Sequence, residues 1–304
     1  MIKVIVLTFV FMIVMGISSG VAGLNSASLV ENASQVMGIT LFVFFLQTIA
    51  LSYPIIKSNL KTWHLVLLVA VAYFGIATFL VQIETLVFLD YFTSIINPEM
   101  IPQLFIQGAV TSIIIAPVAV LLLRGRKSDA NETLQSVRLG MSKLQALVKV
   151  STLAVLFVIF YVFFGIFVAW QNPALGEYYG DLIAKMADVG TTMLLLQAGR
   201  ALVFIMLAFP IVKTSQGRTW EKALMIGLLF CILTASNLLI PTSFMPGTVR
   251  MSHFTEIAIP GFIFGVLVAW LMNRSHSSIS DLFGRVKEVD FEKTVVTPEQ
   301  VIIS

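Results

Sequence analysis

Charge is scarce in this chain. Only 12% of its 304 residues are Asp, Glu, Lys or Arg, whereas 58% are hydrophobic. A soluble domain carries about 25% charged residues, so most of this surface must face something other than water. We attribute the formal net charge of +3 to membrane topology and contact with anionic lipid rather than to nucleic-acid binding.

Cysteine and histidine are also rare, and this excludes several kinds of chemistry. Cys231 is the only cysteine, so neither an intramolecular disulfide nor a CxxC redox pair can form. Of three histidines, His64 and His276 fall at the ends of apolar segments, which leaves His253 without a histidine partner for haem. The sequence contains no HExxH, GxSxG or Walker motif. We therefore expect no cofactor.

Long apolar segments are what the chain has in abundance. A hydrocarbon core about 30 Å thick requires about 20 apolar residues in a helix. Because the segments are continuous and rich in Leu, Phe and Ala, they predict helices rather than the alternating strands of a barrel. We expect an all-α integral membrane protein with about eight transmembrane helices, at 2–24, 38–56, 64–88, 104–123, 150–170, 190–212, 222–241 and 253–273.

The first segment has a second interpretation. Lys3, an apolar run and the small-residue stretch at 16–23 are typical of a cleaved signal peptide. The run is longer than a usual signal-peptide core, however, and its pattern returns later in the chain. We expect it to be retained as a span; cleavage would leave seven. The matching residues are Lys3-Val4, Leu7, Phe11 and Ile13 against Lys149-Val150, Leu153, Phe157 and Ile159.

Basic residues alternate between the loops. One set of loops and termini holds sixteen Lys and Arg residues, the other holds only Lys185 and Arg250, and Arg200 lies inside a span. Because positive residues concentrate in cytoplasmic loops, both termini are expected in the cytoplasm. Short loops and a strong charge bias favour a plasma membrane. The sixteen are Lys3, Lys57, Lys61, Arg124, Arg126, Lys127, Arg138, Lys143, Lys149, Lys213, Arg218, Lys222, Arg274, Arg285, Lys287 and Lys293.

The chain repeats itself. YPIIKS at 53–58 returns as FPIVKT at 209–214, and a tryptophan follows each copy. The fourth and eighth segments also end alike, in VAVLLLR at 118–124 and VAWLMNR at 268–274. Four spans per copy is an even number, so the copies would share one orientation in the membrane, as in some transporters.

This repeat defines the expected domain organisation. The first four-helix repeat covers residues 1–123 and the second covers 150–273. Between them, 124–149 is expected to form a cytoplasmic amphipathic connector, because its apolar residues recur at three- and four-residue steps. Residues 274–304 read as a polar cytoplasmic tail.

Polar residues inside the spans are the candidate functional residues. An ionisable group at the centre of a span costs about 2.5–3.5 kcal/mol, so it requires a partner or water. Arg200 lies in the middle of the sixth segment, with Gln197 one turn away. The remaining candidates lie in the outer half of the bilayer, and with Arg200 at the floor they suggest an outward-facing vestibule. They are Glu84, Gln107, Arg250, His253 and Glu256.

Three functions remain open. In a transporter or ligand-binding protein, Arg200 or Arg250 would hold a small ion or anionic molecule while Glu84, Glu256 and His253 exchange protons or bind a cation. In an assembly or sensing protein, Arg200 would only fix helix packing. In an enzyme, His253 and Glu256 would be an acid–base pair, or weak metal ligands together with Glu84. The lipid bilayer is the expected partner, and the sequence does not indicate oligomeric state.

Overall fold

The computed structural model describes residues 1–24, 33–92, 97–124, 141–180, 186–243 and 245–274. Within these ranges the chain is helical, and eight helices are long and apolar enough to cross a membrane. The structure therefore supports a multi-pass membrane protein. The elements are α1 (Ile2–Val21), α2 (Ala33–Lys57), α3 (Thr62–Phe74), η2 (Gly75–Phe79), α4 (Leu80–Val87), α5 (Leu89–Phe92), α6 (Met100–Arg124), α7 (Lys143–Phe167), η4 (Ala169–Gln171), α8 (Pro173–Tyr178), α10 (Met186–Thr214), α11 (Thr219–Ala235), η5 (Ser236–Leu239) and α12 (Gly247–Asn273).

Some boundaries differ from the expected ones. α7 begins at Lys143 rather than at residue 150, because Ser142 caps it: the Ser142 hydroxyl accepts a hydrogen bond from the Gln145 N–H at 3.2 Å. The end of the expected connector is thus the first two turns of the fifth span. Residues 125–140 of that connector and 275–304 of the expected tail lie outside the described residues.

The third span contains a change of helical type that the sequence did not predict. α3 passes into the π-helical turn η2, and α4 continues to Val87. A π turn adds one residue, so residues after it are rotated by about 100° around the axis relative to those before it. Glu84 lies in α4, and its direction is therefore set by η2.

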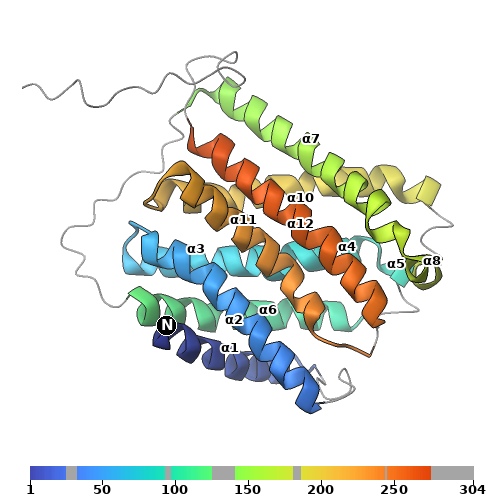
Figure 1. Ribbon diagram of the computed structural model, residues 1–304, viewed down its shortest axis with the longest axis horizontal. Helices are drawn as coiled ribbons and strands as arrows, with labels where there is room; N and C mark the ends of the chain where they lie inside the picture. The colour runs from blue at the N-terminus through green and yellow to red at the C-terminus, as the bar shows by residue number, and fades with distance from the viewer. Residues whose placement is uncertain (25–32, 93–96, 125–140, 181–185, 244, 275–304) are drawn as a thin grey trace, which may run out of the picture.

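The first four and the last four spans pack with matching sets of neighbours (Figure 1). In the first set, α1 contacts α2 and α6, and α3 and α2 each contact α6. In the second, α7 contacts α10 and α12, and α11 and α10 each contact α12. The backbones of α11 and α12 approach closely, because a Cβ on Gly265 would lie 2.6 Å from the Ile226 carbonyl oxygen. Glycine is required there because no side chain fits between the two backbones.

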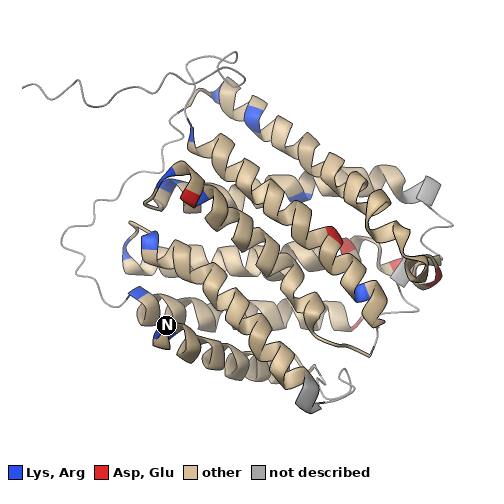
Figure 2. Cartoon of the chain, viewed as in Figure 1, with Lys and Arg blue, Asp and Glu red and all other residues tan. Residues whose placement is uncertain are grey.

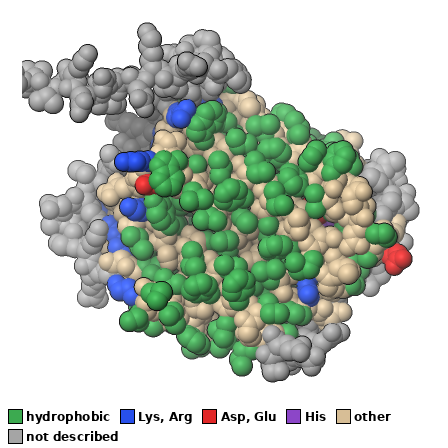
Figure 3. Space-filling view, in the orientation of Figure 1, with side chains coloured by type: hydrophobic (Ala, Val, Ile, Leu, Met, Phe, Trp, Pro, Cys, Tyr) green, Lys and Arg blue, Asp and Glu red, His purple; other side chains and the backbone are tan. Residues whose placement is uncertain are grey.

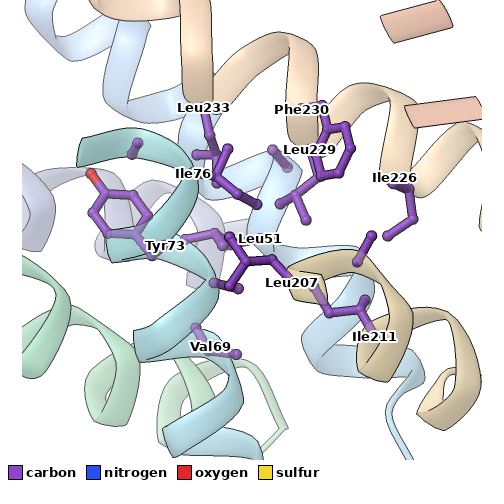
Figure 4. Close-up of a cluster of buried hydrophobic side chains, with 14 of the residues drawn as sticks. Leu51, Val69, Tyr73, Ile76, Leu207, Ile211, Ile226, Leu229, Phe230 and Leu233 are labelled. Atoms are coloured by element: carbon purple, nitrogen blue, oxygen red, sulfur yellow. The ribbon is translucent and has the colours of Figure 1, made fainter. Parts of the chain in front are cut away.

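The two sets of spans meet through their middle helices. α2 and α3 with η2 face α10 and α11, and the contact is apolar (Figure 4). Leu51, Tyr73 and Ile76 from one side pack with Leu207 and Leu229 from the other, and all are buried. This interface forms the centre of the core.

Most described Lys and Arg residues lie at one end of the bundle, which we call the basic end (Figure 2). The ends of the two copies of the repeated hexapeptide meet there: Ser58, the last residue of the first copy, forms an antiparallel bridge with Ser215, which follows the second copy. The Asn59 N–H donates to the Thr214 carbonyl and the Gln216 N–H donates to the Lys57 carbonyl, both at 2.8 Å. The hexapeptide therefore joins the two sets of spans.

Hydrophobic side chains cover the wide face of the bundle (Figure 3). Ile113, Leu195 and Met206 lie within spans, yet each is about two-thirds exposed, at 67–69%. A soluble protein rarely exposes a large contiguous apolar surface. Contact with the acyl chains of a lipid bilayer explains this surface.

Candidate functional site

Arg200 lies in the middle of α10 and points into the bundle. Its side chain is only 12% exposed, and its guanidinium forms an ion pair with Glu84 of α4. Arg200 Nη1 also donates to Gln197 Oε1 at 2.8 Å, one turn away on the same helix. Two ionisable residues 116 positions apart in the sequence are thus paired, and this pairing supplies the partner that a charge inside a membrane needs.

Tyr161 of α7 completes this group of side chains, which we call the Arg200 cluster. Its hydroxyl donates to Glu84 Oε1 at 2.9 Å and lies 3.1 Å from the sulfur of Met193. The cluster therefore takes residues from the third, fifth and sixth spans. Sequence reasoning missed Tyr161, although it is the only tyrosine between residues 143 and 171.

Two buried hydrogen-bond donors in the cluster have no partner. Arg200 Nε and Gln197 Nε2 are both shielded from solvent, and neither finds an acceptor. Gln197 as a whole is 0% exposed. Each unpaired buried donor costs about 1–3 kcal/mol. The cluster therefore lacks acceptors for two of its buried donors.

A second polar group forms at the start of α12. His253 Nδ1 lies 2.7 Å from Glu256 Oε2, and His253 Nε2 lies 2.9 Å from the hydroxyl of Tyr179. Because a carboxylate only accepts, Nδ1 of the imidazole donates to Glu256, and in the neutral imidazole Nε2 then accepts from the phenol. We call this carboxylate–imidazole–phenol chain the His253 chain. Its His and Glu side chains are 20% and 14% exposed, so water reaches it.

α7 lies between the two groups. A Cβ on Gly165 would lie 3.6 Å from Glu256 Oε1, and Tyr161 is one turn away from Gly165 on the same helix. Tyr161 and Tyr179 both pack against a small buried cluster containing Met193. The Arg200 cluster and the His253 chain are therefore neighbours.

The pKa of Tyr179 reflects the proximity of the Arg200 cluster to the His253 chain. Burial raises the pKa of Tyr179 above its ordinary value, and Tyr178, Glu256 and Glu84 raise it further through electrostatic repulsion of the phenolate. Burial alone raises the pKa of the adjacent Tyr178 to about 12. Tyr179 thus responds to carboxylates from both groups.

The other predicted residues lie apart from these contacts. Gln107 of α6 donates to the Ser19 hydroxyl of α1 at 2.7 Å. Arg250 is half-buried in the first turn of α12, and within the described ranges no carboxylate pairs with it.

Among the described residues, no three His, Cys, Asp or Glu side chains are close enough to hold a metal ion. His253, Glu256 and Glu84 therefore do not form a three-ligand set there.

Comparison of the chain with protein-family models, with curated proteins and with solved structures finds no significant match.

Proposed function

We propose that the chain is a transporter or ligand-binding membrane protein that binds a small anion at the Arg200 cluster. The observation that carries the proposal is the pair of buried, unpartnered donors on Arg200 and Gln197. An anion supplies the hydrogen-bond acceptor that both donors need. It also supplies negative charge beside a guanidinium, and bonds to charged groups are the stronger ones.

Helix packing alone is a weaker explanation of the cluster. Removing two charges from water costs more than their attraction usually returns, so a buried ion pair contributes little net stability. Intramembrane charges more commonly mark a ligand or ion pathway. Tyr161, Met193 and Gln197 surround Glu84 and Arg200 closely. This crowding favours a small ligand such as chloride, nitrate or a short carboxylate.

A transport role also fits the organisation of the chain. We infer two parallel four-helix repeats, residues 1–123 and 150–273, joined by 124–149 and followed by a tail at 274–304. Matching neighbours in the two sets of spans and the paired hexapeptides support this inference. Paired repeats with a site inside the bundle are a recurrent transporter architecture.

The orientation follows from charge. We infer that the basic end faces the cytoplasm, which places both termini inside and the His253 chain near the outer surface. A plasma membrane is the location that we propose.

The test is ligand-dependent stability of the purified protein in detergent. A ligand present at 100 times its dissociation constant stabilises by about 2.7 kcal/mol, which raises the melting temperature by several degrees. Chloride, nitrate, acetate and lactate salts are compared at constant ionic strength. We expect at least one anion to raise the melting temperature of the wild-type protein.

The matched control is the double variant Arg200→Gln with Glu84→Gln. It removes both charges, so it leaves neither one unpaired, and it is expected to fold but not to respond to the anion. If no anion stabilises the wild type, or if the double variant responds equally, the anion site does not exist. If the double variant is less stable than the wild type and neither protein responds to an anion, the cluster serves only helix packing.

A further inference from the structure

The His253 chain has the components of a proton relay. Histidine is the side chain whose charge changes most readily near neutral pH, and here it bridges a carboxylate and a phenol. A proton taken up at His253 Nε2 displaces the hydrogen bond from Tyr179. The proton on Nδ1 then passes to Glu256 Oε2, and the imidazole is again neutral.

Beyond this chain, Glu84 is an acceptor that contacts the same segment of α7. Glu256 turns its other oxygen, Oε1, toward Gly165 of α7. One turn along α7, Tyr161 donates directly to Glu84, and Glu256 is close enough to act electrostatically on the Tyr161 phenol. Tyr161 therefore lies between the two carboxylates.

Protonation of Glu84 changes what Arg200 can bind. In the described structure Glu84 neutralises the guanidinium, and an anion must compete with that carboxylate. When Glu84 carries a proton, the guanidinium has no counter-charge and attracts an anion. By linkage, an anion at Arg200 favours the protonated form of Glu84 to the same extent.

We propose that the Tyr179–His253–Glu256 chain exchanges protons between the outer surface and Glu84, so that the Arg200 cluster takes up a small anion together with a proton. This proposal rests on the anion site proposed above. The groups that contact Glu84 or act on it are Tyr161 on α7, Arg200 on α10 and Tyr179 after α8, and Glu256 on α12 acts on the same Tyr161 phenol. Among the described residues, the ion pair of Arg200 is with Glu84 and not with Glu256.

Two neighbouring tyrosines give a matched pair of variants. Tyr178 and Tyr179 are adjacent and their rings meet edge to face with 4.7 Å between centroids, but the hydroxyl that bonds His253 is that of Tyr179. Tyr179→Phe removes this hydrogen bond with little change in volume. Tyr178→Phe makes the same chemical change beside it.

The first measurement is the affinity for chloride, nitrate and acetate at pH 6 and pH 8. We expect the wild type to bind the best of these anions about tenfold more tightly at pH 6, because the anion is taken up together with a proton. Glu84→Gln mimics the protonated carboxyl, so its affinity should be high and equal at both pH values. An equal affinity of the wild type at pH 6 and pH 8 would overturn the proton coupling and leave the anion site standing. If no anion binds at either pH, the proposed function itself fails.

The second measurement is proton movement in proteoliposomes that contain a pH-sensitive dye, driven by a gradient of the same anion. Wild type and Tyr178→Phe should acidify the lumen at the same rate. Tyr179→Phe and His253→Gln should slow acidification about tenfold while the anion still stabilises the detergent-solubilised protein. Equal rates in Tyr179→Phe and Tyr178→Phe would rule out the relay.

Discussion

Gln47 and Gln197 are both 0% exposed glutamines near the middle of spans, yet their surroundings differ. Gln47 is fully bonded: its Oε1 accepts from Tyr73 at 2.9 Å, and its Nε2 donates to Ser236 at 3.1 Å and to Asn237 at 3.0 Å. Gln197 accepts one bond from Arg200, and its amide nitrogen has no partner.

The contrast separates two roles for a buried amide. Gln47 joins α2, α3 and η5 through neutral, satisfied bonds, and this is how buried polar groups specify packing. The amide nitrogen of Gln197 is a buried donor without a partner, and it lies beside the charged Arg200. The satisfied amide of Gln47 stabilises packing, whereas the unpaired donor of Gln197 needs a separate explanation, which in our proposal is a bound anion.

The largest effect is expected from a change to the ion pair beside Gln197. Arg200→Ala leaves the Glu84 carboxylate without its counter-charge, so the protein should lose about 3–5 kcal/mol of unfolding free energy. The double variant with glutamine at both positions should lose much less. Fluorescence of the four tryptophans during denaturation in mixed micelles measures both. Equal losses in the two proteins would show that the pair has no special electrostatic role.

Gln47→Leu removes the glutamine whose hydrogen bonds are all satisfied. It leaves the buried Tyr73 hydroxyl and the Ser236 and Asn237 side chains without their shared partner. We expect a loss of about 1–3 kcal/mol with unchanged anion affinity. A fall in anion affinity without a fall in stability would contradict the structural role of Gln47.

Lys149 extends the comparison to a buried charge that is satisfied. It is 1% exposed and donates to the carbonyls of Leu271 at 2.9 Å and Arg274 at 2.6 Å, at the end of α12. Lys149→Met keeps the apolar stem but removes both bonds, so we expect a loss of about 1–2 kcal/mol. The exposed Lys143 gives the control, since Lys143→Met should change the thermal midpoint little.

Gln197→Leu should affect binding more than folding. The substitution removes a donor from the cluster, and we expect anion affinity to fall about tenfold, which corresponds to about 1.4 kcal/mol. The loss in unfolding free energy should be smaller than that of Gln47→Leu. Titration calorimetry against the anion selected in the stability screen measures the affinity, and an unchanged value would remove Gln197 from the site.

The smallest effect is expected from Gln107→Leu. Gln107 is half-buried and makes a neutral hydrogen bond to Ser19, so its loss should cost less than about 1 kcal/mol. Anion affinity should stay at the wild-type value. A large loss of affinity would extend the site to Gln107, which the sequence alone had named as a candidate residue.

The apolar spans could be predicted because their length and composition suffice to define them, and the eight apolar helices are confirmed. The meeting of Arg200 with Glu84 could only be suspected, since one sequence says that a buried charge needs a partner but not which one. The direction of Glu84 depends on η2, and the three-dimensional packing that stabilises a π turn has no simple sequence signal. Tyr161 and Tyr179 were missed for the same reason: tyrosine is common at membrane interfaces, and only contacts distinguish a site.

The antiparallel pairing at the ends of the two hexapeptides keeps its register, though not its hydrogen bonds, when the two copies are exchanged. Exchange of the copies turns Ser58 and Ser215 into Thr214 and Asn59, and these two residues also pair, through the Asn59 N–H and the Thr214 carbonyl. A contact of this kind is the one that two identical subunits make across a two-fold axis. If the repeats arose by duplication, their ancestor was a four-span protein that dimerised through this segment in one common orientation. A chain cut within residues 125–140 should then reassemble from its two fragments.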